Sequence, residues 1–197
     1  MANGIGLCGS HRTGKTTLAA KIAEKSKLPF IKTATSQVFA RNGLDPAERL
    51  DFASRIRIQH EILREAEKDW DKAEHAFVTD RTPIDMMAYT MVDIVGTSKV
   101  EFSELQRYFD RCYSITNRFF SCLFFLEPGI PIIYEKGKAA LNRSYIEHLN
   151  VLMKGFILDD RLERPVRMIP KEILALEERA AWVDESLKKL RIIDCQL

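Results

Sequence analysis

The stretch Gly9-Ser10-His11-Arg12-Thr13-Gly14-Lys15-Thr16 decides the fold of this chain. It has the form Gly-x4-Gly-Lys-Thr, and it stands between a short apolar run at 5–8 and a segment at 16–25 with apolar residues at helical spacing. A strand before such a motif and a helix after it are the context of a phosphate-binding loop. The glycines let backbone N–H groups point at phosphate oxygens beside the positive end of the helix. The motif therefore predicts a P-loop.

The residue types of this loop indicate a nucleoside triphosphate with its metal ion. We expect Lys15 to contact the β- and γ-phosphates of ATP, and the hydroxyl of Thr16 to be a ligand of Mg²⁺. The other residues expected around ATP are Gly9, His11, Arg12, Thr13, Gly14 and Thr17. Within this group, His11 occupies the variable part of the motif, where a solvent-facing loop residue is the simpler interpretation.

The rest of the chain alternates short apolar runs with amphipathic segments. The pattern predicts further strands at 28–31, 76–79, 119–126 and 166–169. It predicts helices at about 36–42, 46–73, 83–95, 103–116, 143–158 and 173–190. Strands that alternate with helices favour a parallel sheet covered on both faces, in one domain over residues 1–197. In such a sheet, ligands bind beyond the carboxyl ends of the strands, so residues just after each strand are the candidates for a site.

Asp80 and Arg81 are the strongest of these candidates. Residues 76–80 form an apolar run that ends in a carboxylate, so Asp80 is expected either to hold Mg²⁺ or to accept a proton from an attacking oxygen. Arg81 offers a planar fork suited to a phosphate, although a local Asp–Arg pair would also explain the two residues. Thr33 follows the second strand on the same edge. Asp85 is a substrate candidate too, but Thr82-x-x-Asp85 is a capping box, which gives Asp85 an equally good structural role.

Two further segments are expected to approach the site. Arg55 and Gln59 are four residues apart and share a helix face, where they are suited to bind a phosphate or a base edge, unless that face is simply solvated. They lie in a helical region at about 33–75 that we assign to the acceptor. Residues 128–143 include Lys138 and Arg143, and this cationic, glycine-bearing segment is expected to close over phosphates as a lid. The alternative is a basic surface loop.

The composition limits the choice of partners. Among 197 residues, 46% are hydrophobic, and the formal net charge is only +2. A dedicated binder of duplex nucleic acid would show a stronger basic excess, so a small nucleotide is the better fit. No apolar run is long enough to cross a bilayer, and the amino-terminal residues lack the pattern of a signal peptide. The four cysteines (Cys8, Cys112, Cys122 and Cys195) are widely spaced, which indicates buried free thiols and a reducing, cytosolic setting.

Together these residues resemble the P-loop nucleoside and nucleotide kinases. The resemblance is strongest to a branch that includes nicotinamide-riboside kinases and small phage-type deoxynucleoside monophosphate kinases. It rests on residues 9–16, on Val78-Thr79-Asp80-Arg81 and on the segment 135–143. It implies an α/β fold with five parallel strands in the order 2-3-1-4-5, an Asp–Arg pair at the acceptor and lid arginines on ATP. Lys138 departs from the pattern, because an arginine is expected there.

We therefore expect an ATP-dependent phosphotransferase of deoxynucleotide metabolism, with a deoxynucleoside monophosphate as the leading acceptor. One alternative keeps the chemistry but transfers the phosphate to a nucleoside or to a modified base in DNA. Another is an ATP-dependent switch or binding module without catalysis. The sequence leaves a homodimer open, and it does not specify the base or sugar.

Overall fold

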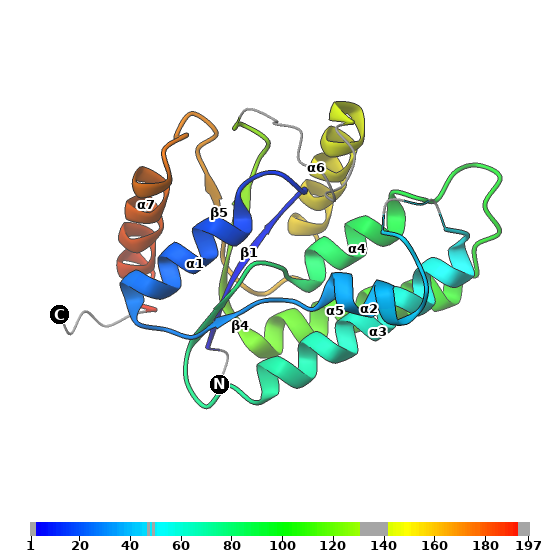
Figure 1. Ribbon diagram of the computed structural model, residues 1–197, viewed down its shortest axis with the longest axis horizontal. Coiled ribbons are helices and arrows are strands. Elements are labelled where there is room, and N and C mark those ends of the chain that lie inside the picture. The colour runs from blue at the N-terminus through cyan, green and yellow to red at the C-terminus, as the bar shows by residue number, and fades with distance from the viewer. Residues whose placement is uncertain (1–2, 47, 49, 131–141, 193–197) are drawn as a thin grey trace.

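The computed structural model describes residues 3–46, 48, 50–130 and 142–192 (Figure 1). Its centre is a sheet of five parallel strands, β1 (Gly4–Gly9), β2 (Phe30–Ile31), β3 (Phe77–Thr79), β4 (Phe120–Leu126) and β5 (Val166–Ile169). The strands lie in the order β2-β3-β1-β4-β5, the order that the resemblance to P-loop kinases implies. Because the chain leaves β1 toward one side of the sheet and later returns to β4 on the other, β1 ends at a topological switch point, where α/β sheets bind their ligands.

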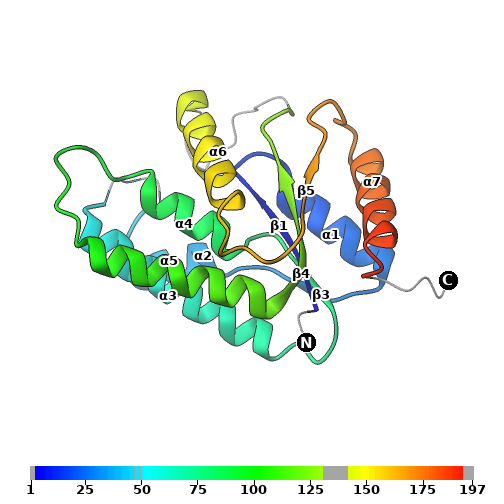
Figure 2. The same cartoon turned by 180° about the vertical axis from the view of Figure 1, so that it is seen from behind.

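The described residues form seven α-helices, which are α1 (Lys15–Ser26), α2 (Thr35–Arg41), α3 (Phe52–Asp71), α4 (Pro83–Met91), α5 (Phe102–Phe119), α6 (Arg143–Ile157) and α7 (Leu176–Lys189). Helices α1 and α7 pack together on one face of the sheet, while α3, α4 and α5 cover the other face (Figure 1). Seen from behind, α3 and α5 lie side by side (Figure 2).

Two apolar cores, one on each face, hold these layers together. Leu7 and Phe124 face α1 and α7, where they pack with Leu18 and Val183. On the opposite face, Trp70 of α3 meets the ring of Phe120 at 5.1 Å between ring centres, nearly edge to face. Because successive residues of β4 are buried on opposite faces, the strand is apolar except for the partly buried Ser121, which explains why its sequence shows no alternation.

The helix boundaries differ from the sequence prediction mainly in the long acceptor-side helix. It was predicted from Pro46 to Ala73, but α3 begins at Phe52, because the carboxylate of Asp51 accepts a hydrogen bond from the Ser54 N–H at 2.7 Å and caps the helix. The strand predicted at 28–31 is shorter and lies at the sheet edge as β2. The helix predicted at 83–95 stops at Met91.

The predicted free thiols are confirmed for three cysteines. Cys8, Cys112 and Cys122 are buried and free of disulfides, and burial raises the pKa of each thiol. Cys195 lies outside the described residues, as do Lys138 and most of the proposed lid. Within the part of the chain that the structure describes, none of the helices is long and apolar enough to span a membrane.

Candidate active site

The P-loop connects β1 to α1 at the switch point of the sheet. Gly9 ends β1 with a φ of 149°, and a side chain there would meet the carbonyl oxygen of Leu126 at 2.4 Å. Gly14 precedes α1 in the left-handed region, with a φ of 81°, where glycine is favoured. Between them, the hydroxyl of the buried Thr13 donates to the Ser10 carbonyl at 2.9 Å. The two glycines and this internal bond give the loop its shape.

Lys15 is folded back over the loop. Its ammonium group donates to the carbonyl oxygens of Gly9 at 2.6 Å and of Ser10 at 2.7 Å, and it lies 3.9 Å from a carboxylate oxygen of Asp85. Burial lowers the pKa of Lys15 to about 8, although the nearby Asp85 opposes the shift. The lysine is therefore a buried cation held at the mouth of the loop, where an incoming phosphate would offer it stronger acceptors.

Asp85 connects the P-loop to the start of α4. One of its carboxylate oxygens accepts a hydrogen bond from the Gly9 N–H at 3.2 Å. The other accepts from the N–H and the hydroxyl of Thr82, at 2.9 and 3.0 Å. Asp85 is fully buried, and burial raises its pKa while Lys15 and Arg81 oppose that shift. Both oxygens of Asp85 are thus occupied by the protein itself, which supports the structural side of the two roles that the sequence left open.

Asp80, Thr16 and Thr33 meet at the carboxyl ends of β2 and β3. The Thr16 hydroxyl donates to Asp80 Oδ2 at 2.6 Å, and the Thr33 N–H donates to Asp80 Oδ1 at 3.4 Å. Within the described part of the chain, the buried hydroxyl oxygen of Thr33 has no hydrogen-bond partner. A hydroxyl and a carboxylate in contact are hard oxygen ligands of the kind that Mg²⁺ takes. Thr16 and Asp80 therefore fit the metal-binding role expected of them.

Arg81 and His11 share a contact with Tyr89 of α4. The guanidinium carbon of Arg81 lies 5.1 Å from the centre of the Tyr89 ring, while the Tyr89 hydroxyl is hydrogen-bonded to His11 Nδ1 at 3.2 Å. The His11 ring also lies 5.8 Å from the ring of Tyr145, at the start of α6. His11 is thus half-buried beside two aromatic side chains, and it is not the fully solvent-facing loop residue considered from the sequence. No periodic signal marks Tyr145 in the sequence. Tyr89, however, lies four residues after Asp85 on the same helix.

Arg55 and Gln59 both point inward from α3. Their side chains are buried, so the solvated helix face considered from the sequence does not describe them. Arg55 Nε donates to Asp93 Oδ2 at 2.6 Å, and its guanidinium carbon lies 5.7 Å from the centre of the Phe39 ring. The guanidinium is therefore buried between a carboxylate and an aromatic ring, in the region that the sequence analysis assigned to the acceptor. Asp93 was missed in the sequence, because it lies beyond the end of α4, where no periodicity marks it.

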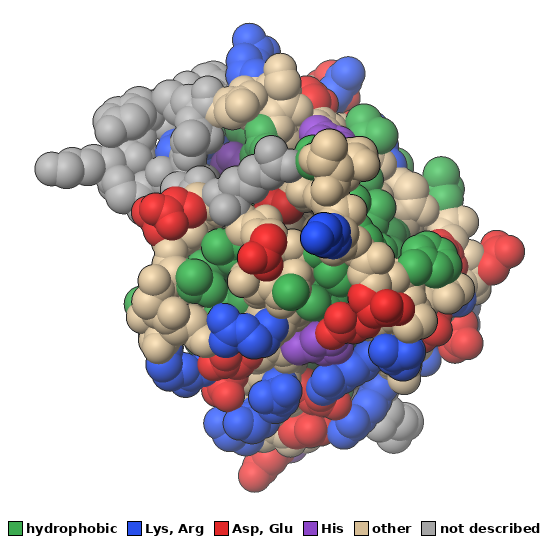
Figure 3. Space-filling view, turned by 90° about the vertical axis from the view of Figure 1, so that its right-hand side faces the viewer, with side chains coloured by type: hydrophobic (Ala, Val, Ile, Leu, Met, Phe, Trp, Pro, Cys, Tyr) green, Lys and Arg blue, Asp and Glu red, His purple; other side chains and the backbone are tan. Residues whose placement is uncertain are grey.

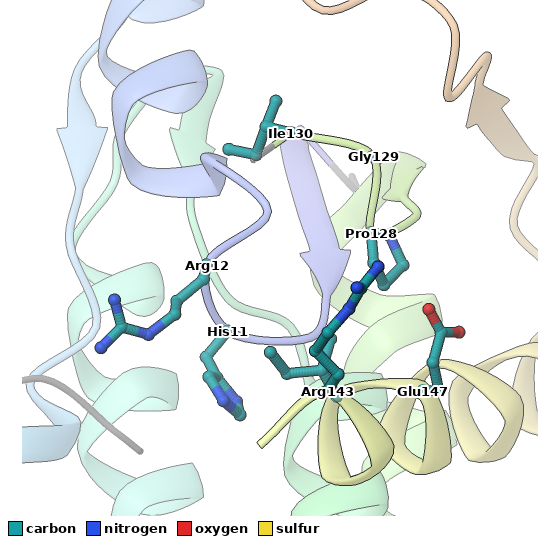
Figure 4. A pocket seen from close by; sticks show the side chains of 8 residues that line it. His11, Arg12, Pro128, Gly129, Ile130, Arg143 and Glu147 are labelled. Atoms are coloured by element: carbon teal, nitrogen blue, oxygen red, sulfur yellow. The ribbon is translucent and has the colours of Figure 1, made fainter. Parts of the chain in front are cut away.

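The remaining loop residues border a pocket of about 410 Å³ (Figure 4). It is lined by His11, Arg12, Pro128, Gly129, Ile130, Arg143, Ile146 and Glu147. Arg143 extends from the start of α6 toward Pro128, whereas Arg12 points away on the other side of His11. Thr17 is exposed on the first turn of α1. The P-loop and both described ends of the segment 128–143 therefore meet around one cavity.

The surface beside α3 and α5 carries charges of both signs. On the face drawn in Figure 3, lysine and arginine side chains are interspersed with aspartate and glutamate. Ion pairs such as Arg118–Asp71 at 2.6 Å and Arg111–Glu67 at 2.9 Å neutralise charges between α3 and α5.

The sheet order, the P-loop and the Thr16–Asp80 contact define the class of the protein, a P-loop nucleotide-binding protein with the strand order expected of nucleoside and nucleotide kinases. The chain belongs to the AAA domain family, whose profile matches residues 5–132. None of the curated proteins matches the chain.

Several solved structures share the fold. Deoxyadenosine kinase from M. mycoides, with the products dCMP and a flexible dCDP bound, is 16% identical with a TM-score of 0.68, over 95% of this chain and 99% of that chain. NadR in complex with NR is 14% identical with a TM-score of 0.68, over 100% of this chain and 52% of that chain. Thymidylate kinase from Candida albicans is 14% identical with a TM-score of 0.58, over 98% and 96%. The expected resemblance to P-loop kinases is confirmed at the level of the fold.

Proposed function

We propose that this chain is a kinase that transfers the γ-phosphate of ATP to a small nucleotide, with a deoxynucleoside monophosphate as the leading acceptor. The P-loop supports the donor half of this proposal, because Lys15, Thr16 and Asp80 are the groups that hold a triphosphate and its metal ion. Mg²⁺, bound through Thr16 and Asp80, would neutralise charge that develops on the transferred phosphoryl group.

The choice of acceptor rests on one observation, which is that both carboxylates near the P-loop accept hydrogen bonds from the protein itself. The two oxygens of Asp80 are bonded to Thr16 and Thr33, and those of Asp85 to Gly9 and Thr82. Each oxygen of both carboxylates thus already accepts a hydrogen bond from the protein, so a hydroxyl acceptor would have to compete with these donors for a base. A monophosphate needs no such base, since its second pKa is about 6 and its oxygens are already ionised near neutral pH. It attacks with an anionic oxygen, and the bond from the γ-phosphorus to the bridging oxygen breaks to release ADP.

Cationic groups on the acceptor side support the same choice. Arg81 lies directly after β3, beside Asp80, and Arg55 faces inward from α3. A bidentate bond from Arg81 to the acceptor phosphate would place the attacking oxygen in line with the γ-phosphate. The Thr33 hydroxyl, which has no partner among the described residues, is a further donor for this acceptor. Arg143, with Lys138, would complete the site over the phosphates of ATP.

A nucleoside acceptor is the second candidate. It is favoured by the higher TM-score with deoxyadenosine kinase, 0.68, than with thymidylate kinase, 0.58. A modified base in DNA would use the same hydroxyl chemistry. An ATP-dependent switch remains the alternative without an acceptor, and a homodimer is an untested expectation.

The acceptor is tested by measuring ADP release over a panel of nucleosides and their monophosphates. We expect a monophosphate to have a much higher kcat/KM than its nucleoside, and Arg81→Ala to remove most of that preference through both kcat and KM. Arg118→Ala, which changes an exposed arginine on α5, is the matched control and should leave the preference intact. A wild-type preference for the nucleoside would replace the monophosphate kinase with a nucleoside kinase. No turnover anywhere on the panel would favour the switch.

A further inference from the structure

Arg179 is a buried cation that the proposed reaction does not use. It lies in the first turn of α7, and only 4% of it is exposed. Among the residues that the structure describes, no carboxylate forms an ion pair with it. A positive charge is also disfavoured near the amino-terminal end of a helix. Something other than helix stability must therefore account for an arginine at this position.

Its hydrogen bonds join two loops at the carboxyl edge of the sheet. Arg179 Nε donates to the carbonyl oxygen of Ile173, in the loop between β5 and α7, at 2.6 Å. Arg179 Nη1 donates to the carbonyl oxygen of Thr13, in the P-loop, at 3.0 Å. The planar guanidinium makes both bonds at once, which the single nitrogen of a lysine would not reproduce in the same geometry.

The contacts of two glycines show how closely this region is packed. A side chain at Gly14 would stand 3.4 Å from Ile130 Cδ1 and 3.7 Å from Arg179 Nη1. A side chain at Gly129 would meet the carbonyl oxygen of Lys171 at 2.7 Å. The P-loop, the segment after β4 and the loop after β5 therefore converge beside Arg179.

The bond to Thr13 has a direct consequence for phosphate binding. The peptide unit between Thr13 and Gly14 is planar and trans, so the Thr13 carbonyl and the Gly14 N–H point in opposite directions. Holding the carbonyl toward α7 directs the Gly14 N–H to the other side of the loop. Because Gly14 is free to adopt many conformations, this peptide unit needs an external tether to stay in one orientation.

We propose that Arg179 is a positioning residue that fixes the Thr13–Gly14 peptide of the P-loop in its phosphate-binding orientation. The inference rests on the proposed function in one respect, that the loop binds a triphosphate. It assigns Arg179 no contact with the ligand. The residue acts through the loop, so its loss should weaken every ligand that is held by the loop amides, whether or not that ligand carries a base.

The test compares two ligands, MgATP and magnesium tripolyphosphate, by calorimetric titration of the whole chain. Arg179→Met keeps the length of the side chain but removes both donors, and we expect it to weaken both ligands about tenfold, the scale of one lost hydrogen bond from a charged donor. Lys189→Met, at the exposed far end of α7, is the matched control and should bind both ligands like the wild type.

Several results would overturn the inference. One is a folded Arg179→Met protein that binds both ligands within twofold of the wild type, even if its thermal midpoint falls, since that describes a purely structural residue. Another is a loss of affinity for MgATP but not for magnesium tripolyphosphate, which would mean that Arg179 acts on the nucleoside part of ATP. If Arg179→Met does not fold, the same titrations are made with Arg179→Lys. We expect this variant to bind both ligands more weakly than the wild type, and binding equal to the wild type would refute the proposal. A wild type that binds neither ligand would instead refute the proposed function.

Discussion

Replacing Asp85 with asparagine is the sharpest test of how the P-loop is held in place. The substitution keeps the shape of the side chain and removes its charge. In the wild type, Oδ2 accepts two hydrogen bonds from Thr82, while Oδ1 accepts one from the Gly9 N–H and lies 3.9 Å from the Lys15 ammonium. An amide has one oxygen, so its best orientation keeps Thr82 satisfied and turns an NH₂ group toward Gly9 and the lysine. Two donors and a buried cation then face one another.

The size of the effect follows from these contacts. One hydrogen bond to a charged acceptor is lost and a buried ion pair is broken, and breaking such a pair from one side costs about 3–5 kcal/mol. For a domain of this size, that corresponds to a fall in Tm of roughly 6–20 °C. Removing Asp85 also removes a charge that raises the pKa of Lys15, so that pKa should fall below its wild-type value.

The assay is thermal unfolding followed by circular dichroism, with Asp51→Asn as the control. Asp51 caps α3 with a similar bond to a backbone N–H, but it is exposed, and asparagine caps a helix about as well as aspartate. The control should therefore melt like the wild type. If Asp85→Asn also melts like the wild type and loses only affinity for the acceptor, then Asp85 is a substrate ligand and its structural role is refuted.

Two further predictions concern the donor side. Because the pKa of Lys15 is about 8, MgATP affinity should be nearly constant up to that pH and then fall about tenfold per pH unit until the pKa in the complex is reached. Calorimetry from pH 7 to 9.5 measures this, and a wild-type profile as flat as that of Lys15→Met would contradict it. Arg143→Ala should lower the turnover number by about 10³-fold or more while changing ATP affinity little, as for other arginines that meet transferring phosphoryl groups. Single-turnover kinetics give the rate of the chemical step. A loss of turnover below threefold would make Arg143 a surface residue.

The fold could be predicted largely from the sequence, because its strongest signals are local. The P-loop needs its glycines in fixed positions, and β4 needs an apolar run because both of its faces are buried. The start of α3 was harder to predict from the sequence. Residues 46–51 carry no helix breaker after Pro46, and the cap at Asp51 becomes evident only from its bond to Ser54.

Site residues that come directly after a strand could be predicted from the sequence. Site residues whose partners are brought to them only by packing could not. Thr16 and Asp80 were expected to lie together, and they do. The partners of Arg55 and His11, which are Asp93 and Tyr89, come from a separate part of the chain, and no spacing rule connects them. Arg179 is farther still, 166 residues from the loop carbonyl to which it donates. Such contacts depend on three-dimensional packing that periodicity does not encode.

The side chain of Tyr89 contacts both the proposed ATP side and the proposed acceptor side of the site. It is hydrogen-bonded to His11 of the P-loop and lies beneath the guanidinium of Arg81. If ATP binding moves His11, the surroundings of Arg81 change as well, so we expect the binding of the two proposed substrates to be thermodynamically coupled. By reciprocity, the factor by which ATP changes the acceptor's dissociation constant equals the factor by which the acceptor changes that of ATP. A kinase with this arrangement would respond to the ratio of its substrates as well as to the concentration of each.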